Sequence, residues 1–84
     1  MPAPIRVLFF ASARDAVGCA ERTLPCAEEG WTEAILWEHL LGAFPALVPL
    51  RASVRLAKNH EYLMAGSRIF PGDEVALIPP VSGG

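Results

Sequence analysis

The last six residues of the sequence, Pro79 to Gly84 (PPVSGG), combine residue types with opposite effects on the backbone. Two prolines restrict the backbone, and three residues later two glycines release it. Chain ends fray and tolerate small residues, so an end without any role is the alternative interpretation. The pattern therefore raises the question of what function a segment would have whose first residues have a restricted backbone and whose last residues have no side chains.

Other side chains of the reactive types form no catalytic pattern. His39 falls on a predicted helix face and His60 in a predicted turn, and both are expected to be ordinary surface residues. Asp73 and Glu74 belong to a Pro-Gly-Asp-Glu segment, where turn geometry explains the glycine and the aspartate without a catalytic carboxylate pair.

Cys19 and Cys26 are too few and too widely spaced for a zinc knuckle, so no metal site is predicted. Each is expected to behave as a small apolar residue, with persulfide carriage and a disulfide between the two as the alternatives. No basic and then apolar leader precedes the first predicted strand. We therefore expect a cytoplasmic protein with reduced thiols.

The composition excludes several classes of protein. Hydrophobic residues make up 52% of the 84 residues and charged residues 19%, which is enough apolar material for one core and argues against disorder. The net charge is -2, and the seven Lys and Arg do not cluster, so nucleic-acid binding is not expected. No apolar run approaches the roughly 20 residues of a membrane span, so no membrane partner is expected either.

One segment has the period of an amphipathic helix, from Thr32 to Phe44. Thr32 can cap it through its side-chain oxygen, Glu33 suits the positive end of the helix dipole, and Pro45 ends it. A shorter helix is predicted over Ser12 to Gly18, with Ser12 as its N-cap and the glycine as its stop.

The strands are predicted from alternating apolar and β-branched residues. They are Ile5 to Ala11, Glu21 to Leu24, Val54 to Lys58, Glu61 to Leu63 and Val75 to Pro79. Asn59 and His60 form a tight turn between the third and fourth of them, and Pro71 to Glu74 form another before the last. The order is therefore strand, strand, helix, strand, strand, strand.

This order predicts an α+β protein of the β-grasp (ubiquitin-like) fold, with a mixed sheet of about five strands and one main helix packed on one face. The first and last strands are expected to lie side by side at its centre. Helix-facing positions would then be Ile5, Val7, Phe9, Val75 and Leu77, and outward positions Leu8, Phe10, Ala76 and Ile78. The outward face is too apolar to be pure solvent surface.

Large aromatic and apolar residues divide into two expected groups. Core or near-core packing is predicted for Trp31, Trp37, Phe44 and Phe70. A docking surface for a partner protein is predicted on the outward face, at Phe10, Tyr62 and Ile78, with Arg14 adding an ion pair at its rim.

Several stretches together carry a resemblance to a known family. They are VLFFASARDAVG, the helix running into FPAL, the turn KNHEY, and above all GDEVALIPPVSGG. With these stretches the sequence resembles the small, sulfur-carrier subunits of molybdopterin synthase, the MoaD/ThiS ubiquitin-like family, over nearly its whole length. Lys58 departs from the family pattern, which more often has valine there.

The resemblance implies that the chemistry lies in the C-terminal carboxylate of Gly84. That carboxylate would be adenylated, converted to a thiocarboxylate, and used to give sulfur to cyclic pyranopterin monophosphate, forming the dithiolene of molybdopterin. A free carboxylate is a poor electrophile, so it needs a good leaving group such as AMP before sulfur can attack. The residues Pro79, Pro80, Val81, Ser82 and Gly83 would thread the carboxylate into partner active sites, because glycines let other backbone approach closely.

The resemblance also implies the partners. They are a large, MoaE-like subunit, joined as a heterotetramer; an adenylyltransferase of the ubiquitin-activating type (MoeB-like); and a sulfur donor such as a cysteine desulfurase or rhodanese. The chain would be a β-grasp domain over residues 1–78 with an extended flexible tail over 79–84. It would act as an enzyme subunit without a complete active site of its own, and would bind no cofactor, the ATP being consumed by the activating partner.

Three other functions fit the same pattern. A sulfur carrier for thiamine thiazole or for transfer-RNA thiolation would share the fold and the two glycines but serve another acceptor. A ubiquitin-like modifier would form isopeptide bonds, and a plain β-grasp interaction module would need no free carboxylate.

Overall fold

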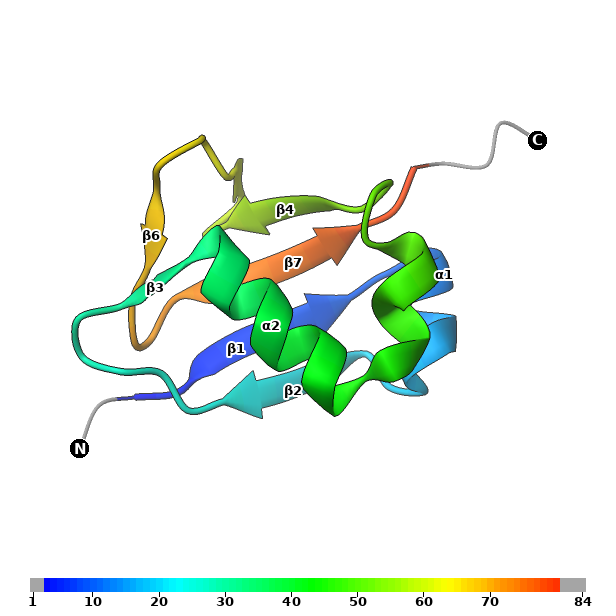
Figure 1. The fold of residues 1–84 in the computed structure, drawn as a ribbon, viewed down its shortest axis with the longest axis horizontal. Helices are drawn as coiled ribbons and strands as arrows, with labels where there is room; N and C mark the ends of the chain where they lie inside the picture. Colours follow the sequence, from blue (N-terminus) through cyan, green and yellow to red (C-terminus); the bar gives the residue numbers. More distant parts are fainter. Residues whose placement is uncertain (1–2, 81–84) are drawn as a thin grey trace.

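The computed structural model describes residues 3–80, and it contains an α2 helix laid over one face of a mixed sheet (Figure 1). In chain order the elements are β1 (Ile5–Phe9), α1 (Ala11–Val17), β2 (Glu21–Leu24), β3 (Trp31–Thr32), α2 (Glu33–Ala43), the 3-10 helix η1 (Pro45–Leu50), β4 (Arg55–Lys58), β5 (Glu61–Tyr62), β6 (Arg68–Ile69) and β7 (Glu74–Ile78). No helix among these residues is long and apolar enough to cross a membrane.

The main sheet has five strands in the order β2-β1-β7-β4-β5. β1 and β7 are parallel neighbours at its centre, with Val7 opposite Val75, and the other pairs are antiparallel. The predicted β-grasp fold, with the first and last strands side by side, is therefore confirmed. β3 and β6 form a separate two-stranded sheet that the sequence analysis did not predict.

The α2 helix begins and ends where its sequence requires. The Thr32 hydroxyl oxygen accepts a hydrogen bond from the Ile35 backbone N–H at 3.2 Å, which satisfies one of the free donors of the first turn. The helix ends at Ala43, before Pro45, and the segment that follows forms η1. Leu36, Trp37 and Leu40 are its buried residues.

The core lies between α2 and the inner face of the sheet. The predicted helix-facing positions are all at most 1% exposed, namely Ile5, Val7, Phe9, Val75 and Leu77. Among the predicted core aromatics, Trp31 and Trp37 are buried, and Phe44 packs edge-to-face on Phe9 with 5.5 Å between ring centroids. Phe70 is 44% exposed, so its prediction as core was wrong.

The turn between β1 and α1 also differs from the prediction. The strand ends at Phe9, and Ala11, predicted as its last residue, instead opens α1 with a left-handed φ of 49°. Phe10 occupies the N-cap position and makes no side-chain cap, so Ser12 is not the cap. Gly18 ends the helix with φ 86°, as predicted for a glycine stop.

The last strand ends one residue earlier than predicted, at Ile78. Pro79 is nevertheless buried, whereas Pro80 is exposed. The packed part of the chain therefore reaches one residue beyond the boundary predicted at residue 78. Val81 to Gly84 lie outside the described residues.

Candidate functional site

The base of the C-terminal segment is fixed by the centre of the sheet. β7 has β1 on one side and β4 on the other, and it is followed directly by the buried Pro79. The predicted reactive carboxyl of Gly84 and the predicted threading residues Val81, Ser82 and Gly83 lie outside the described part of the chain, so these roles stay predictions. The structure locates the point from which they start.

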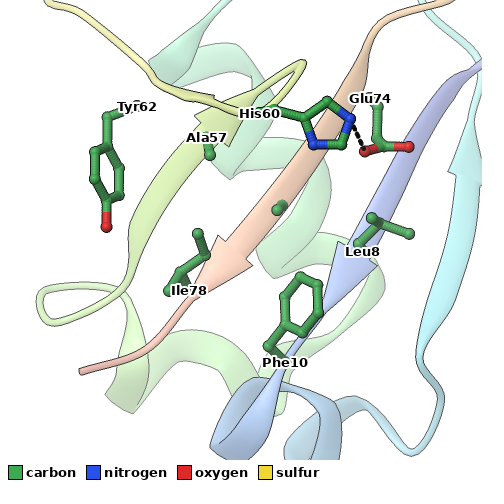
Figure 2. Close-up of a pocket in the computed structure, with 8 residues that line it drawn as sticks. Leu8, Phe10, Ala57, His60, Tyr62, Glu74 and Ile78 are labelled. Carbon is green, nitrogen blue, oxygen red and sulfur yellow. Dashed lines mark ion pairs between the residues drawn. The ribbon is translucent and has the colours of Figure 1, made fainter. Parts of the chain in front are cut away.

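Beside that point, the outer face of the sheet has a shallow hollow of about 380 Å³. Its lining comes from four strands and the turns that follow them: Leu8, Phe10, Ala57, His60, Tyr62, Glu74, Ala76 and Ile78. Three of the four predicted docking residues, Phe10, Tyr62 and Ile78, are thus brought together around one hollow (Figure 2). Docking itself stays a prediction.

Strand register explains why these residues meet. Tyr62 lies opposite Ala57, Ala57 opposite Ala76, and Ala76 opposite Leu8, so one row of side chains crosses β5, β4, β7 and β1 on the outer face. The small side chains of the two alanines lie in the middle of this row, and the larger side chains of Tyr62 and Leu8 lie at its ends. A hollow is the result.

The apolar end of the hollow lies next to the start of the tail. Phe10 and Ile78 follow the paired residues Phe9 and Leu77, and Figure 2 shows them at the same end of the hollow. Phe10 is 47% exposed and Ile78 is partly exposed. Arg55, opposite Ile78 on β4, lies with its guanidinium 4.6 Å from the centre of the Tyr62 ring, so a cation borders this end.

The other end of the outer face is charged. Arg6 donates from Nε to Glu21 at 2.8 Å and from Nη1 to Glu74 at 3.1 Å, which joins β1 to both of its neighbours. The hydrogen bond to Glu21 and the negative charge of that residue raise the pKa of the Arg6 guanidinium, so it stays charged. His60 Nε2 lies 3.8 Å from Glu74 (Figure 2), a contact that sequence reasoning missed because it depends on strand register.

The fourth predicted docking residue, Arg14, is separate from the hollow. It is exposed on α1 and does not contribute to the hollow's lining. α1 nevertheless lies at the same end of the sheet as the C-terminal end of β7 (Figure 1). A rim position for Arg14 therefore stays a prediction.

Hydrogen bonds join the Asn59–His60 turn to the Asp73–Glu74 turn. Asn59 and His60 both have positive φ, 50° and 74°, as a two-residue hairpin turn requires. The Asn59 amide donates to Asp73 at 3.1 Å and accepts from the Glu74 N–H at 3.0 Å, while Asp73 also accepts from the Phe70 N–H at 2.8 Å. The turn role predicted for Asp73 is confirmed, because its carboxylate accepts hydrogen bonds that hold the two turns in place.

The remaining candidates pack into the domain. Cys19 is partly buried and Cys26 is buried, and both are free thiols, so the alternative of a disulfide between them is contradicted. The Cys26 thiol donates to the Ile69 carbonyl at 3.8 Å. His39 is exposed, as predicted, but its ring stacks on Trp31 with 4.1 Å between centroids, which the sequence analysis did not foresee.

Comparison with protein families matches this chain to one of them. The sequence profile of the ThiS family matches residues 7–84. The molybdopterin synthase sulfur carrier subunit of Arabidopsis thaliana is 41% identical over 80 residues, covering 95% of this chain and 82% of that protein. The subunit of the same name from Chlamydomonas reinhardtii is 38% identical over 82 residues, covering 95% of this chain and 98% of that protein.

Comparison with solved structures agrees on the fold. SAMP1, small archaeal modifier protein 1, from Haloferax volcanii superposes with a TM-score of 0.83 at 27% identity, covering 98% of this chain and all of that one. A chain from the complex of subunits 1 and 2 of molybdopterin-converting factor from Helicobacter pylori superposes with a TM-score of 0.67 at 20% identity, covering 96% of this chain and 99% of that one. The two structures share the ubiquitin-like β-grasp fold described above.

Proposed function

This chain belongs to the ThiS family and to the molybdopterin synthase sulfur carrier subunits, and on that premise we propose that it carries the sulfur used to make molybdopterin. The observation that carries the proposal is the match over 95% of the chain, at 41% and 38% identity, to proteins with that one name. The chain acts as a subunit of the synthase, with no complete active site of its own.

The proposed chemistry takes place at the carboxyl group of Gly84. An adenylyltransferase of the ubiquitin-activating type uses ATP to convert it to an acyl adenylate and releases pyrophosphate. The terminal persulfide sulfur of a sulfur donor such as a cysteine desulfurase or rhodanese then displaces AMP, and a thiol reductant cleaves the S–S bond of the resulting acyl disulfide, which leaves a thiocarboxylate. The thiocarboxylate gives its sulfur to cyclic pyranopterin monophosphate. Adenylation is needed because a carboxylate alone does not accept a nucleophile.

The fixed base of the tail supports this proposal. A carboxylate that must enter two different partner sites needs a slender end and a rigid start, because each freely rotating bond raises the entropic cost of insertion. Pro79 is buried directly after the central strand, and the ring of Pro80 fixes its own φ and restricts the backbone of Pro79 before it. The two glycines at the end of the sequence let partner backbone approach closely.

The outer face supports a large-subunit partner. Its apolar end, with Phe10 and Ile78, is exposed beside the start of the tail, so a partner that covers this end also receives the tail. We propose that the large subunit of the synthase docks here, in a heterotetramer with one carrier at each end of a partner dimer, and that Arg14 lies at the rim. The free thiols fit a reducing compartment, and we propose the cytoplasm.

One structural likeness favours a second candidate function. SAMP1 is named a modifier protein and has the highest of the TM-scores reported above, 0.83. A modifier would transfer its activated terminus to a lysine amine and form an isopeptide bond. A sulfur carrier for thiazole or for transfer RNA would instead form the same thiocarboxylate and give its sulfur to another acceptor.

Removal of Gly84 tests the tail chemistry. The purified chain is incubated with the activating enzyme, ATP and a sulfur source, and intact mass reports the exchange of one oxygen for sulfur. We expect the shortened chain to gain no sulfur, while its free energy of unfolding changes by less than about 0.5 kcal/mol. Gain of sulfur by the shortened chain at the normal rate would contradict the role of Gly84.

The acceptor is tested in cells that lack their own small subunit. Rescue of molybdenum-cofactor synthesis by the intact chain, and none by the chain without Gly84, is the expected result. In the same cells, lysine-linked adducts of the chain without rescue would favour the modifier, and a thiocarboxylated chain without rescue would favour another sulfur pathway.

A further inference from the structure

Lys58 is the only lysine in this sequence, and every other residue among the seven Lys and Arg is an arginine. Arginine keeps its charge at all ordinary pH values and is a poor nucleophile, whereas a lysine amine attacks activated carboxyl groups. The chain thus has one side-chain amine that its own activated terminus could modify. The position and the contacts of that amine decide whether it can attack the activated carboxyl group.

The amine of Lys58 is held by the second sheet. Its Nζ donates a 2.9 Å hydrogen bond to the Arg68 backbone carbonyl on β6. The Arg68 guanidinium in turn donates to the backbone carbonyls of Glu29 and Gly30, at 3.3 and 3.1 Å. β6 pairs only with β3 in the described part of the chain, so Lys58 ties the small sheet to the main one.

Lys58 also lies away from the start of the tail, and on the face of the sheet opposite to the hollow. It pairs with Val75, whose side chain faces the core, whereas the tail starts after Ile78, at the other end of the β4–β7 pair. β6 lies at the end of the sheet opposite to the end from which β7 leads into the tail (Figure 1). The side chain is partly buried and is not part of the hollow on the outer face.

We propose that this placement makes the only lysine of the chain a poor acceptor for an activated Gly84, because its amine is hydrogen-bonded between the two sheets, so that this side chain does not compete with sulfur for the acyl adenylate. This inference rests on the function proposed above. In the competing reaction the Nζ lone pair attacks the Gly84 carbonyl carbon, a C–N bond forms, AMP leaves with the electron pair of the broken C–O bond, and a proton passes to solvent. Two carrier molecules joined in this way would have lost one reactive end.

The first test measures the reactivity of the amine without any partner. The folded chain is treated with acetyl adenylate, a small acyl adenylate, and peptide mapping separates acetylation of Lys58 from that of the N-terminal amine. The matched control is Arg22→Lys, which adds an amine at an exposed position of β2 without changing the net charge. We expect Lys58 to react about tenfold more slowly than the lysine at position 22, the factor that loss of one charged hydrogen bond represents. A smaller ratio, equal rates included, overturns the proposal.

The second test uses the activating enzyme and ATP without a sulfur donor. We expect pyrophosphate release and no product in which Gly84 is linked to Lys58. A Gly84–Lys58 link, within one chain or between two, overturns the inference and leaves the adenylation step supported. Absence of pyrophosphate release contradicts the proposed function instead, and the acetylation result is unaffected by it.

Lys58→Arg separates tethering from nucleophilic participation. It removes the amine and keeps a cationic donor at the same place, so the variant should gain sulfur at the wild-type rate. A variant that unfolds at the wild-type temperature but gains no sulfur would show that the amine takes part in loading, and would overturn the proposal.

Discussion

The two faces of the central strands carry the same kinds of residue, but one face is buried and the other is partly exposed. On the inner face Val7, Val75 and Leu77 are 0% exposed beneath α2. On the outer face the alternating positions Leu8 and Ile78 are equally apolar, yet they stay partly exposed, and no part of the described chain covers them. The inner face is specified by the need to fold, whereas the apolar outer face adds little to the fold and is the surface on which we propose that a partner docks.

The largest expected effect comes from the inner face. Leu77→Ala removes a fully buried side chain from the centre of the sheet and leaves a cavity, so the free energy of unfolding should fall by about 2–5 kcal/mol. Equilibrium unfolding in urea measures it. The adjacent outer residue provides the control, because Ala76→Ser should change the value by less than about 0.5 kcal/mol. Equal losses for the two variants would contradict the division between the faces.

The division was predictable from the sequence because it follows from local periodicity. Alternation in Ile5 to Phe9 and in Val75 to Ile78 assigns each residue to one face of the sheet. The 3.6-residue period of α2 predicts the apolar helix that covers the inner face. The cap of α2 was predictable for a similar reason, since Thr32 needs only a donor three residues away in the chain.

What could not be predicted depends on contacts between distant residues. β3 and β6 are two residues long, too short for a periodic signal, and exist because Trp31 and Ile69 meet in the fold. Phe70 follows β6, and its ring lies against Gly30, where a Cβ atom would come within 2.8 Å of ring atoms. The residue therefore packs on a loop instead of in the core, and it stays 44% exposed. The His60–Glu74 contact likewise requires the register of two strands that the sequence leaves open.

A smaller effect is expected on the outer face, and on binding instead of folding. Ile78→Asp places a charge at the apolar end of the hollow, beside the start of the tail, so the dissociation constant for the large subunit should rise about 10- to 100-fold. Titration calorimetry with the purified large subunit measures it.

Val48→Asp is the matched control for docking. Val48 is 59% exposed on η1 and does not line the hollow, so a charge there should leave the affinity unchanged. Unchanged affinity for Ile78→Asp, with unfolding like that of the wild type, would remove the docking role of the outer face. Equal weakening by both variants would indicate a general effect of negative charge.

The two cysteines extend the comparison to its smallest expected effect. Cys26 packs within the core, whereas Cys19 is only partly buried at its margin, so alkylation of the folded chain should modify Cys19 first. Burial, with smaller contributions from the charges of Asp73 and Glu29, raises the pKa of the Cys26 thiol above its ordinary value of 9.0.

This raised pKa gives the stability a defined pH dependence. Between the pKa of the unfolded chain and the higher one of the folded chain, the unfolded state binds fewer protons, so the free energy of unfolding falls as pH rises. The contribution of Cys26 is complete below pH 9.0 and is lost as pH rises through the folded pKa. Urea unfolding of the wild type and of Cys26→Ala at several pH values measures it: the wild type should be more stable by about 1 kcal/mol at neutral pH, and the difference should shrink above pH 9.0. A difference that stays constant with pH would mean that the Cys26 thiol ionises as readily in the folded chain as in the unfolded one, and a difference that grows would mean that it ionises more readily; either result would contradict its burial in the core.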